Sequence, residues 1–151
     1  MPRRWTVLFG ALCAVAAVRP SVLEAQKTDR GQKPPAVSMG QNAPNPFGTD
    51  TRIPFTVGDP ATCKDPVKTY RVTLRVYNLL SQVVAVPVLV SGPAGLMGNV
   101  PTEGVALPCG AYLAYWDGRY LSTGSPAAAS IYLYRIEVEG TTLVRKMVLA
   151  R

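Results

Sequence analysis

Residues 131–149 read IYLYRIEVEGTTLVRKMVL, and this stretch decides the fold. Residues 131–138 and residues 141–149 are rich in β-branched and aromatic side chains, and Glu139-Gly140 between them is a hairpin signal. Tyr132 and Tyr134 are two residues apart, so they lie on one face of the first strand. We expect both rings to pack inward, with their hydroxyls reaching the rim of the core.

The same two-residue period recurs upstream of this hairpin. Residues 70–78 read YRVTLRVYN and alternate between apolar and polar side chains, which is typical of a strand with one buried face. Pro87 lies inside another strand-like run and favours a sheet edge or a bulge there. The remaining strands are predicted at residues 51–57, 82–90 and 112–116, with a proline-rich extended segment at 39–47 that opens the domain.

Turn-rich segments separate these strands, and the longest of them is residues 91–110, which we predict to be irregular. No segment after Val37 has helical periodicity of useful length. Seven short strands and no helix predict an all-β domain over residues 37–151, a seven-stranded immunoglobulin-like antiparallel β-sandwich.

The N-terminus has the layout of a secretory signal peptide. A basic start with Arg3 and Arg4 precedes an uninterrupted apolar run, residues 5–18, and Ala25 provides a small residue for cleavage. We expect a signal peptide at 1–25, a polar flexible leader at 26–36, and export to the periplasm, the cell surface or the medium. Two alternatives stay open: an uncleaved anchor, although the apolar run falls short of the roughly 20 residues needed to span a membrane, and a lipoprotein modified at Cys13.

After cleavage two cysteines remain, Cys63 and Cys109. An even pair in an oxidising compartment is most simply one disulfide. A metal site is the rival interpretation, but the chain has no CxxC spacing and no histidine, so neither metal nor cofactor is expected.

Charge and composition exclude several classes of function. Removal of residues 1–25 takes three Arg and one Glu from 16 basic and 9 acidic residues, which leaves a net charge of +5. These charges are scattered and form no nucleic-acid-binding stripe. The absence of histidine excludes imidazole catalysis. The sequence contains no Gly-rich phosphate loop. Glu137 and Glu139 are interpreted as a solvated edge face and not as a pair of catalytic carboxylates. We expect a protein that is not an enzyme and has no small-molecule substrate.

Five motifs occur in an order that resembles a known family. The chain is similar to the C-terminal immunoglobulin-like domains of the flagellar hook-cap (FlgD-type) fold and to the C-terminal sorting domains of type IX secretion cargo. The similarity covers roughly residues 38–151. The motifs are QNAPNPF at 41–47, VTLRVYNLLSQVV at 72–84, WDGR at 116–119, IYLYRI at 131–136 and RKMVL at 145–149.

The resemblance implies scaffold roles for a set of motif residues: Asn45, Pro46, Phe47, Trp116, Asp117, Gly118, Tyr132 and Tyr134. It also implies that residues 145–151 are recognised by outer-membrane export machinery. The chain departs from the family pattern in three respects: the inserted segment 91–110, Ser130 in place of a common Gly, and the cysteine pair.

Two functions follow as expectations. The domain serves in secretion, sorting or attachment at the cell envelope, or it is an accessory subunit of an envelope assembly that binds through a sheet edge or through residues 91–110. The absence of a cargo segment before the domain favours the second.

The expected partners are proteins of the envelope or export machinery, and membrane contact is expected to be peripheral or through an uncleaved signal segment. Candidate interaction residues are Leu96, Met97, Arg145, Lys146 and Arg151. Sugar binding through Tyr112, Tyr115 and Tyr120 is a third hypothesis.

Overall fold

Strands are the only regular elements in the part of the chain that the structure describes, as the sequence predicts. The computed structural model describes residues 37–59, 63–65 and 67–151, which belong to one compact unit, Gly31–Arg151. The predicted signal peptide (1–25) and leader (26–36) lie outside the described residues. A search of the described residues finds no helix with the length and hydropathy needed to cross a membrane.

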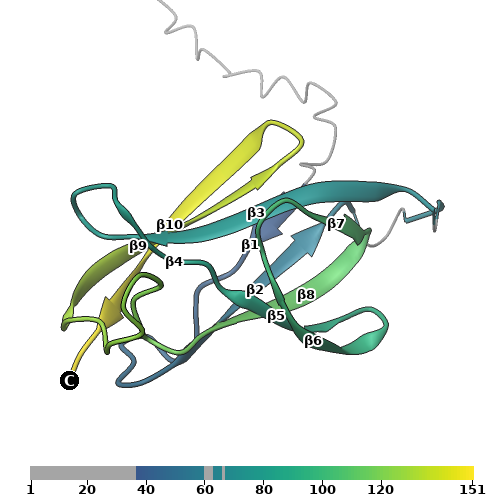
Figure 1. Cartoon of the computed structure of the whole chain (residues 1–151). Helices are drawn as coiled ribbons and strands as arrows, with labels where there is room; N and C mark the ends of the chain where they lie inside the picture. The colour runs from purple at the N-terminus through teal and green to yellow at the C-terminus, as the bar shows by residue number, and fades with distance from the viewer. Residues whose placement is uncertain (1–36, 60–62, 66) are drawn as a thin grey trace, which may run out of the picture. The chain divides into compact units, whose positions relative to one another are not determined.

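Two antiparallel sheets of five strands each form a β-sandwich (Figure 1). The first, called the β2 sheet, has the order β1-β2-β8-β5-β6; the second, called the β3 sheet, has the order β10-β9-β3-β4, with β7 also paired to β3. The strands are β1 (Val37–Met39), β2 (Thr51–Val57), β3 (Thr69–Tyr77), β4 (Val83–Ala85), β5 (Val88–Gly92), β6 (Gly95–Pro101), β7 (Val105–Pro108), β8 (Gly110–Trp116), β9 (Ser130–Val138) and β10 (Thr141–Leu149).

The core lies between the two sheets and is filled by alternate residues of the long strands. In β3 the buried positions are Val72, Leu74 and Val76, as the alternation predicts. In β9 Tyr132, Tyr134, Ile136 and Val138 face inward. Successive side chains of a strand point to opposite faces, so this period of two gives each sheet one apolar face for the other to cover.

The middle of the chain changes sheets twice. Val83–Ala85 pairs with β3, but after Val86-Pro87 the chain continues as β5 in the β2 sheet. It turns back as β6 against β5 and returns to pair with β3 as β7.

Thr102 lies where this hairpin crosses between the sheets. Its side chain is fully buried, and its hydroxyl is 3.0 Å from the Leu74 carbonyl oxygen and 2.7 Å from that of Pro87. Its backbone accepts a bond from Leu74 N and donates to Pro87 O. Thr102 therefore joins β7 and β4 along one edge of β3.

This region corrects two predictions. Residues 82–90, predicted as one strand, form two strands in different sheets because Pro87 breaks the ladder. Residues 91–110, predicted to be irregular, contain β6 and β7. The pairing of β6 with β5 is interrupted by a register shift, and Asn99 has a φ of 55°. A bulge of this kind disturbs the alternation that marks a strand in sequence.

The opening segment is the third correction. Residues 39–47 do not form one extended strand: β1 ends at Met39, and beyond it pairing is limited to isolated bridges of Ala43 with Arg52 and of Phe47 with Leu149. The described residues thus contain ten strands where the sequence predicts seven.

Candidate functional site

The motif residues converge on the end of the sandwich where the last strand finishes. Phe47 packs against Trp116 with ring centroids 5.6 Å apart, and Trp116 packs against Tyr132 at 5.3 Å, both edge to face. All three rings are buried. Aromatic pairs of this geometry add stabilisation beyond the burial of their area, so three motifs distant in sequence form one piece of core.

The hydroxyl of Tyr134 holds the opening segment on this core. It donates to the Gly40 carbonyl oxygen at 2.9 Å and accepts from the Asn42 backbone N–H at 3.0 Å. Asn42 is itself buried and donates its side-chain amide to Thr51 Oγ1 at 3.0 Å. These bonds satisfy polar groups of irregular backbone that would otherwise be buried without partners.

Residues 41–49, called the edge cover, lie along the outer edge of β10. Four hydrogen-bonding groups of this edge between residue 146 and residue 150 have partners in the edge cover. The bonds are Gln41 Nε2 to Lys146 O at 3.0 Å, Val148 N to Asn45 Oδ1 at 2.9 Å, Phe47 N to Val148 O at 3.0 Å and Ala150 N to Phe47 O at 2.9 Å. An exposed sheet edge can pair with a strand of another chain. Over these residues the edge of β10 is already bonded to the edge cover.

Gly118 and Arg151 complete the contact at the C-terminal end. Gly118 has a φ of 66°, and a Cβ atom there would be 2.2 Å from the Thr49 carbonyl oxygen. Only glycine fits this close approach to the edge cover. Arg151 donates from Nε to Gly48 O at 3.0 Å and from Nη2 to Gly118 O at 3.2 Å. The Asp117 carboxylate accepts from the Arg119 backbone N–H at 3.0 Å and so fixes the turn.

The candidate interaction residues are divided between core and surface. Within 145–151, Met147 and Leu149 are fully buried, so the segment is not a free recognition tail. Lys146 is exposed, whereas Arg145, also exposed, donates from Nε to Met39 O at 2.8 Å. Arg151 likewise donates to backbone carbonyls, those of Gly48 and Gly118, and all three cationic side chains of this segment are exposed to a partner.

Met97 and Leu96 lie in β6 and not in a loop. The Met97 side chain is half-buried and packs against the core. The Leu96 side chain lies outside the described residues.

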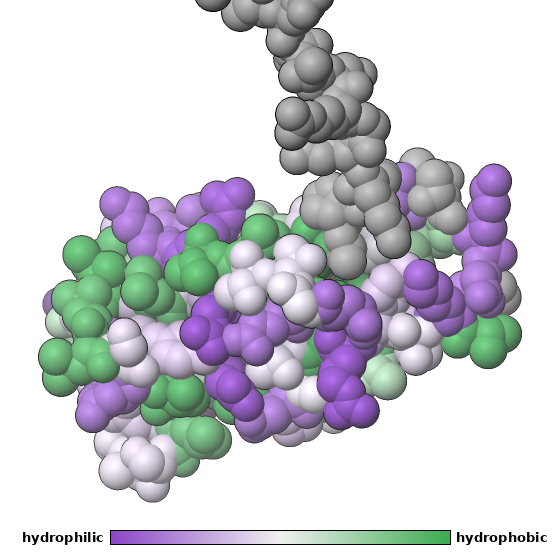
Figure 2. Space-filling view, turned by 90° about the horizontal axis from the view of Figure 1, so that it is seen from above, coloured by the Kyte–Doolittle hydropathy of each residue, from purple (hydrophilic) through white to green (hydrophobic). Residues whose placement is uncertain are grey.

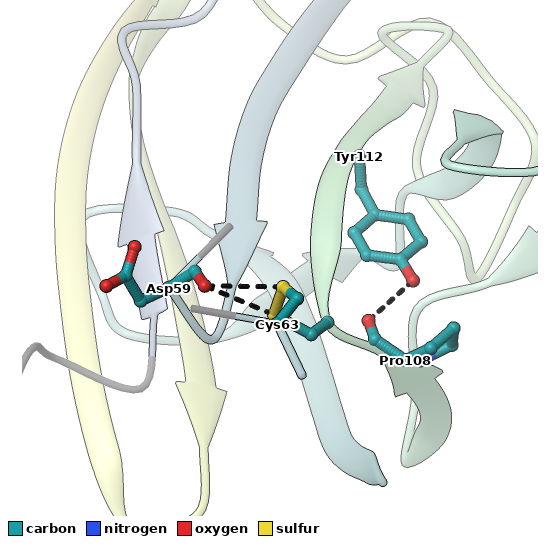
Figure 3. Close-up of a disulfide and its surroundings, with 5 residues drawn as sticks. Asp59, Cys63, Pro108 and Tyr112 are labelled. Carbon is teal, nitrogen blue, oxygen red and sulfur yellow. Dashed lines mark hydrogen bonds between the residues drawn. A yellow bond between two sulfur atoms is a disulfide. The ribbon is translucent and has the colours of Figure 1, made fainter. Parts of the chain in front are cut away.

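The predicted disulfide is present at the opposite end of the strands (Figure 3). Cys63 and Cys109 are bonded with their Cα atoms 5.8 Å apart, which joins the segment after β2 to the turn between β7 and β8. The Asp59 carbonyl oxygen lies 3.3 Å from Cys63 Sγ and 3.6 Å from Cys109 Sγ. Nearby, the Tyr112 hydroxyl donates to Pro108 O at 2.7 Å.

The carboxylates of the β3 sheet have structural partners. Glu103 pairs with Arg75 and Glu137 with Arg135, both at 2.5 Å, and Glu139 accepts a bond from the Arg71 backbone. Because β9 is a central strand and Glu139 lies in the hairpin turn, the predicted edge face for Glu137 and Glu139 is wrong. The residues described contain no cluster of three or more His, Cys, Asp or Glu side chains suited to a metal ion.

The phenols of the core carry the clearest electrostatic shifts. Burial raises the pKa of Tyr132 to about 12, and burial also raises the pKa values of Tyr134 and Tyr112. A hydrogen bond from the Ala128 backbone lowers the pKa of Tyr120, whose hydroxyl is 3.3 Å from that of Tyr132. These hydroxyls bond to backbone groups, as expected of structural tyrosines.

Sequence reasoning missed three buried polar residues, Asn42, Thr51 and Thr102. Asn42 stands inside the QNAPNPF motif next to prolines, so its position could have suggested that its side chain replaces missing backbone donors. Nothing in the sequence around Thr102 distinguishes it from a loop threonine.

Comparison with known proteins adds no family assignment: no family model, curated protein or solved structure matches the chain.

Proposed function

We propose that this chain is an exported, non-catalytic domain of immunoglobulin-like type that serves in secretion, sorting or attachment at the cell envelope, through its C-terminal end. The observation that carries the proposal is the contact between the edge cover and the last strand. Four of the five motifs on which the family resemblance rests, at 41–47, 116–119, 131–136 and 145–149, meet there.

The geometry indicates how such an end would be recognised. Because the edge cover occupies the outer edge of β10 over residues 146–150, a partner cannot add a strand there without displacing it. A partner can still reach the exposed Lys146 ammonium and the exposed Arg151 side chain, although Arg151 also donates to the carbonyls of Gly48 and Gly118. We infer that recognition uses these side chains, held in fixed positions by the sandwich.

Exposed apolar side chains at the same end support a contact role. In the β3–β4 turn Leu79 is 63 % and Leu80 78 % exposed, and Ile131, opposite Val148 on β10, is 42 % exposed. Figure 2 shows hydrophobic residues gathered toward this end of the domain, beside a hydrophilic band. Exposed apolar groups that cluster in this way are typical of interaction sites.

Deletion of residues 145–151 would not test the proposal, because it removes Met147 and Leu149 from the core. The better variant is Lys146→Ala with Arg151→Ala in the full chain, produced in its native cell, with thermal unfolding of the purified protein as the check on folding. We expect a folded protein that is lost from the cell surface and medium and accumulates in the periplasm. Val144→Ala, at a 52 % exposed position of the same strand, is the matched control. An unchanged distribution of the double variant would disprove recognition through these side chains.

A second function, an accessory subunit of an envelope assembly, is favoured by one observation. β6 is the last strand of the β2 sheet, and among the described residues it pairs with β5 alone. Its outer edge can therefore accept a strand of a partner. Affinity purification from solubilised membranes tests this: co-purification of a partner that Val100→Pro abolishes supports it, and recovery of the chain as a lone monomer opposes it.

A further inference from the structure

A hollow of about 310 Å³ lies on the outer side of the β2 sheet, next to the WDGR motif, and the proposed sorting role does not use it. The link between β4 and β5 forms one wall, and the loop after β8, with Arg119, Tyr120 and Gly124, forms another. Tyr115, directly opposite Val88 in the sheet, lines the hollow together with that residue. A volume of this size is at the lower end of the roughly 300–1,000 Å³ typical of small-molecule sites.

The loop that walls the hollow is fixed by its own hydrogen bonds. Arg119 is held at three points: its N–H by the Asp117 carboxylate, its carbonyl by Trp116 Nε1 at 2.9 Å, and its Nη1 by Gly124 O at 2.9 Å. Gly124 N donates to Tyr120 O at 2.8 Å, and the Tyr120 hydroxyl accepts from the backbone of Ala128 at 3.1 Å. A wall that is already ordered loses little conformational entropy when a ligand binds.

The chemistry of the lining is amphipathic. The phenol rings of Tyr115 and Tyr120 provide flat apolar surface with polar tips, and the Asp117 carboxylate and Arg119 guanidinium provide an acceptor and a donor beside them. A pyranose sugar has the complementary form, with C–H groups on its ring faces and hydroxyls around its rim.

The charges around the hollow balance. The Arg52 guanidinium lies 5.9 Å from the centre of the Tyr115 ring on the β2 side, away from the hollow. Asp50 and Asp117 also act on this phenol: burial first, then these two carboxylates, raise the pKa of Tyr115, and Arg52 opposes them. Among the residues that line the hollow, Asp117 and Arg119 carry opposite charges, and this balance favours a neutral ligand over an anionic one.

We propose that the hollow beside Tyr115 binds one neutral pyranose residue of a glycan. Of the three tyrosines that the sequence offers for sugar binding, Tyr115 and Tyr120 line the hollow, whereas Tyr112 is 4 % exposed, packs in the core against Phe55, and takes no part.

The test is a titration of the isotope-labelled full chain, as exported, followed by amide NMR shifts. The probes are glucose, galactose, mannose and N-acetylglucosamine, with galacturonate as the anionic comparison, at up to about 50 mM, well above a weak Kd of about 1 mM. We expect at least one neutral sugar to give saturable shifts confined to Tyr115 and residues 118–124. Tyr115→Ala should weaken binding about three- to tenfold, and Tyr115→Phe, which keeps the ring, should stay within about twofold.

Three results would overturn the proposal. They are the absence of shifts with every neutral sugar, saturable shifts that Tyr115→Ala leaves unchanged, and binding of galacturonate more tightly than galactose. The amide spectrum of each variant reports its fold in the same experiment, so loss of binding through misfolding is recognised directly.

Discussion

Replacement of Tyr134 by Phe removes one oxygen atom at the place where the opening segment is tied to the core. The ring stays buried, but the Gly40 carbonyl loses its donor and the Asn42 N–H, in a residue only 2 % exposed, loses its acceptor. A buried polar group left without a partner costs about 1–3 kcal/mol, and a typical hydrogen bond contributes about 0.5–1.5 kcal/mol. We therefore expect Tyr134→Phe to lower the free energy of unfolding by about 2–4 kcal/mol, a large part of the total of a small domain.

Urea denaturation followed by Trp116 fluorescence measures this change. Tyr132→Phe is the matched control because it lies on the same strand and its hydroxyl donates to the carbonyl of Ala128, an exposed residue that water can reach. We expect that control to lose about 1 kcal/mol. Hydrogen exchange at Val148 N should also accelerate in Tyr134→Phe, because Asn45 in the loosened edge cover is its acceptor. Equal losses in the two variants, with unchanged exchange at Val148, would refute the role given to the Tyr134 hydroxyl.

Three further predictions concern stability. Reduction of Cys63–Cys109, which closes a loop with a sequence separation of 46 residues, should lower the unfolding free energy by up to about 4 kcal/mol; equal urea midpoints with and without reductant would contradict this. Gly118→Ala should cost at least about 2 kcal/mol, because a positive φ is strained for alanine and its Cβ would overlap the Thr49 carbonyl oxygen; a thermal midpoint equal to that of the unaltered protein would show that the contact is absent. Because burial raises the pKa of Tyr132 to about 12, stability should be constant below about pH 10 and fall as the pH rises from about 10 to 12, where the unfolded chain releases the phenol proton first. A stability profile that is flat over that interval would count against the shift.

Each of these three predictions has a control variant. Gly140 has a φ of 80° with no atom within 4 Å of an added Cβ, so Gly140→Ala carries the backbone strain without the overlap and should cost about 1 kcal/mol. Tyr132→Phe should make the alkaline fall in stability smaller and leave the part contributed by Tyr134 and Tyr112, whose pKa values burial also raises. Cys63→Ser with Cys109→Ser should reproduce the effect of reduction and make the protein insensitive to reductant.

The parts of the fold that the sequence predicts are those where one face of a strand is buried. β2, β3 and β9 are half-buried over seven or nine residues, so their apolar residues recur with period two, whereas in β10 the buried positions are limited to Met147 and Leu149 at its end. β4 and β7 are only three and four residues long, and β6 is an edge strand with a register shift. The position of such a strand depends on the strands that it pairs with, because its own sequence has no clear alternation of apolar and polar residues.

In the candidate site, too, some features can be predicted from the sequence and others cannot. Trp116 next to Asp117-Gly118 and the inward pair Tyr132 and Tyr134 are visible as motifs because their residue types are distinctive. The edge cover cannot be seen in the sequence, because it depends on contacts such as the bond between Val148 N and Asn45 Oδ1, which are 103 residues apart. No local pattern reports a contact of that range, and so the sequence predicts a recognition segment at residues 145–151 without showing that Met147 and Leu149 belong to the core.

The central claim, that the C-terminal end of this sandwich directs export or attachment, is tested most directly by transfer to another protein. A reporter with an export signal is placed before residues 31–151, which include every described strand, and its distribution among periplasm, cell surface and medium is measured in the native cell. We expect the reporter to reach the cell surface or medium with the unaltered domain, and to stay in the periplasm when Lys146 and Arg151 are replaced by alanine. A reporter retained in the periplasm in both cases, on a domain shown to be folded, would contradict it.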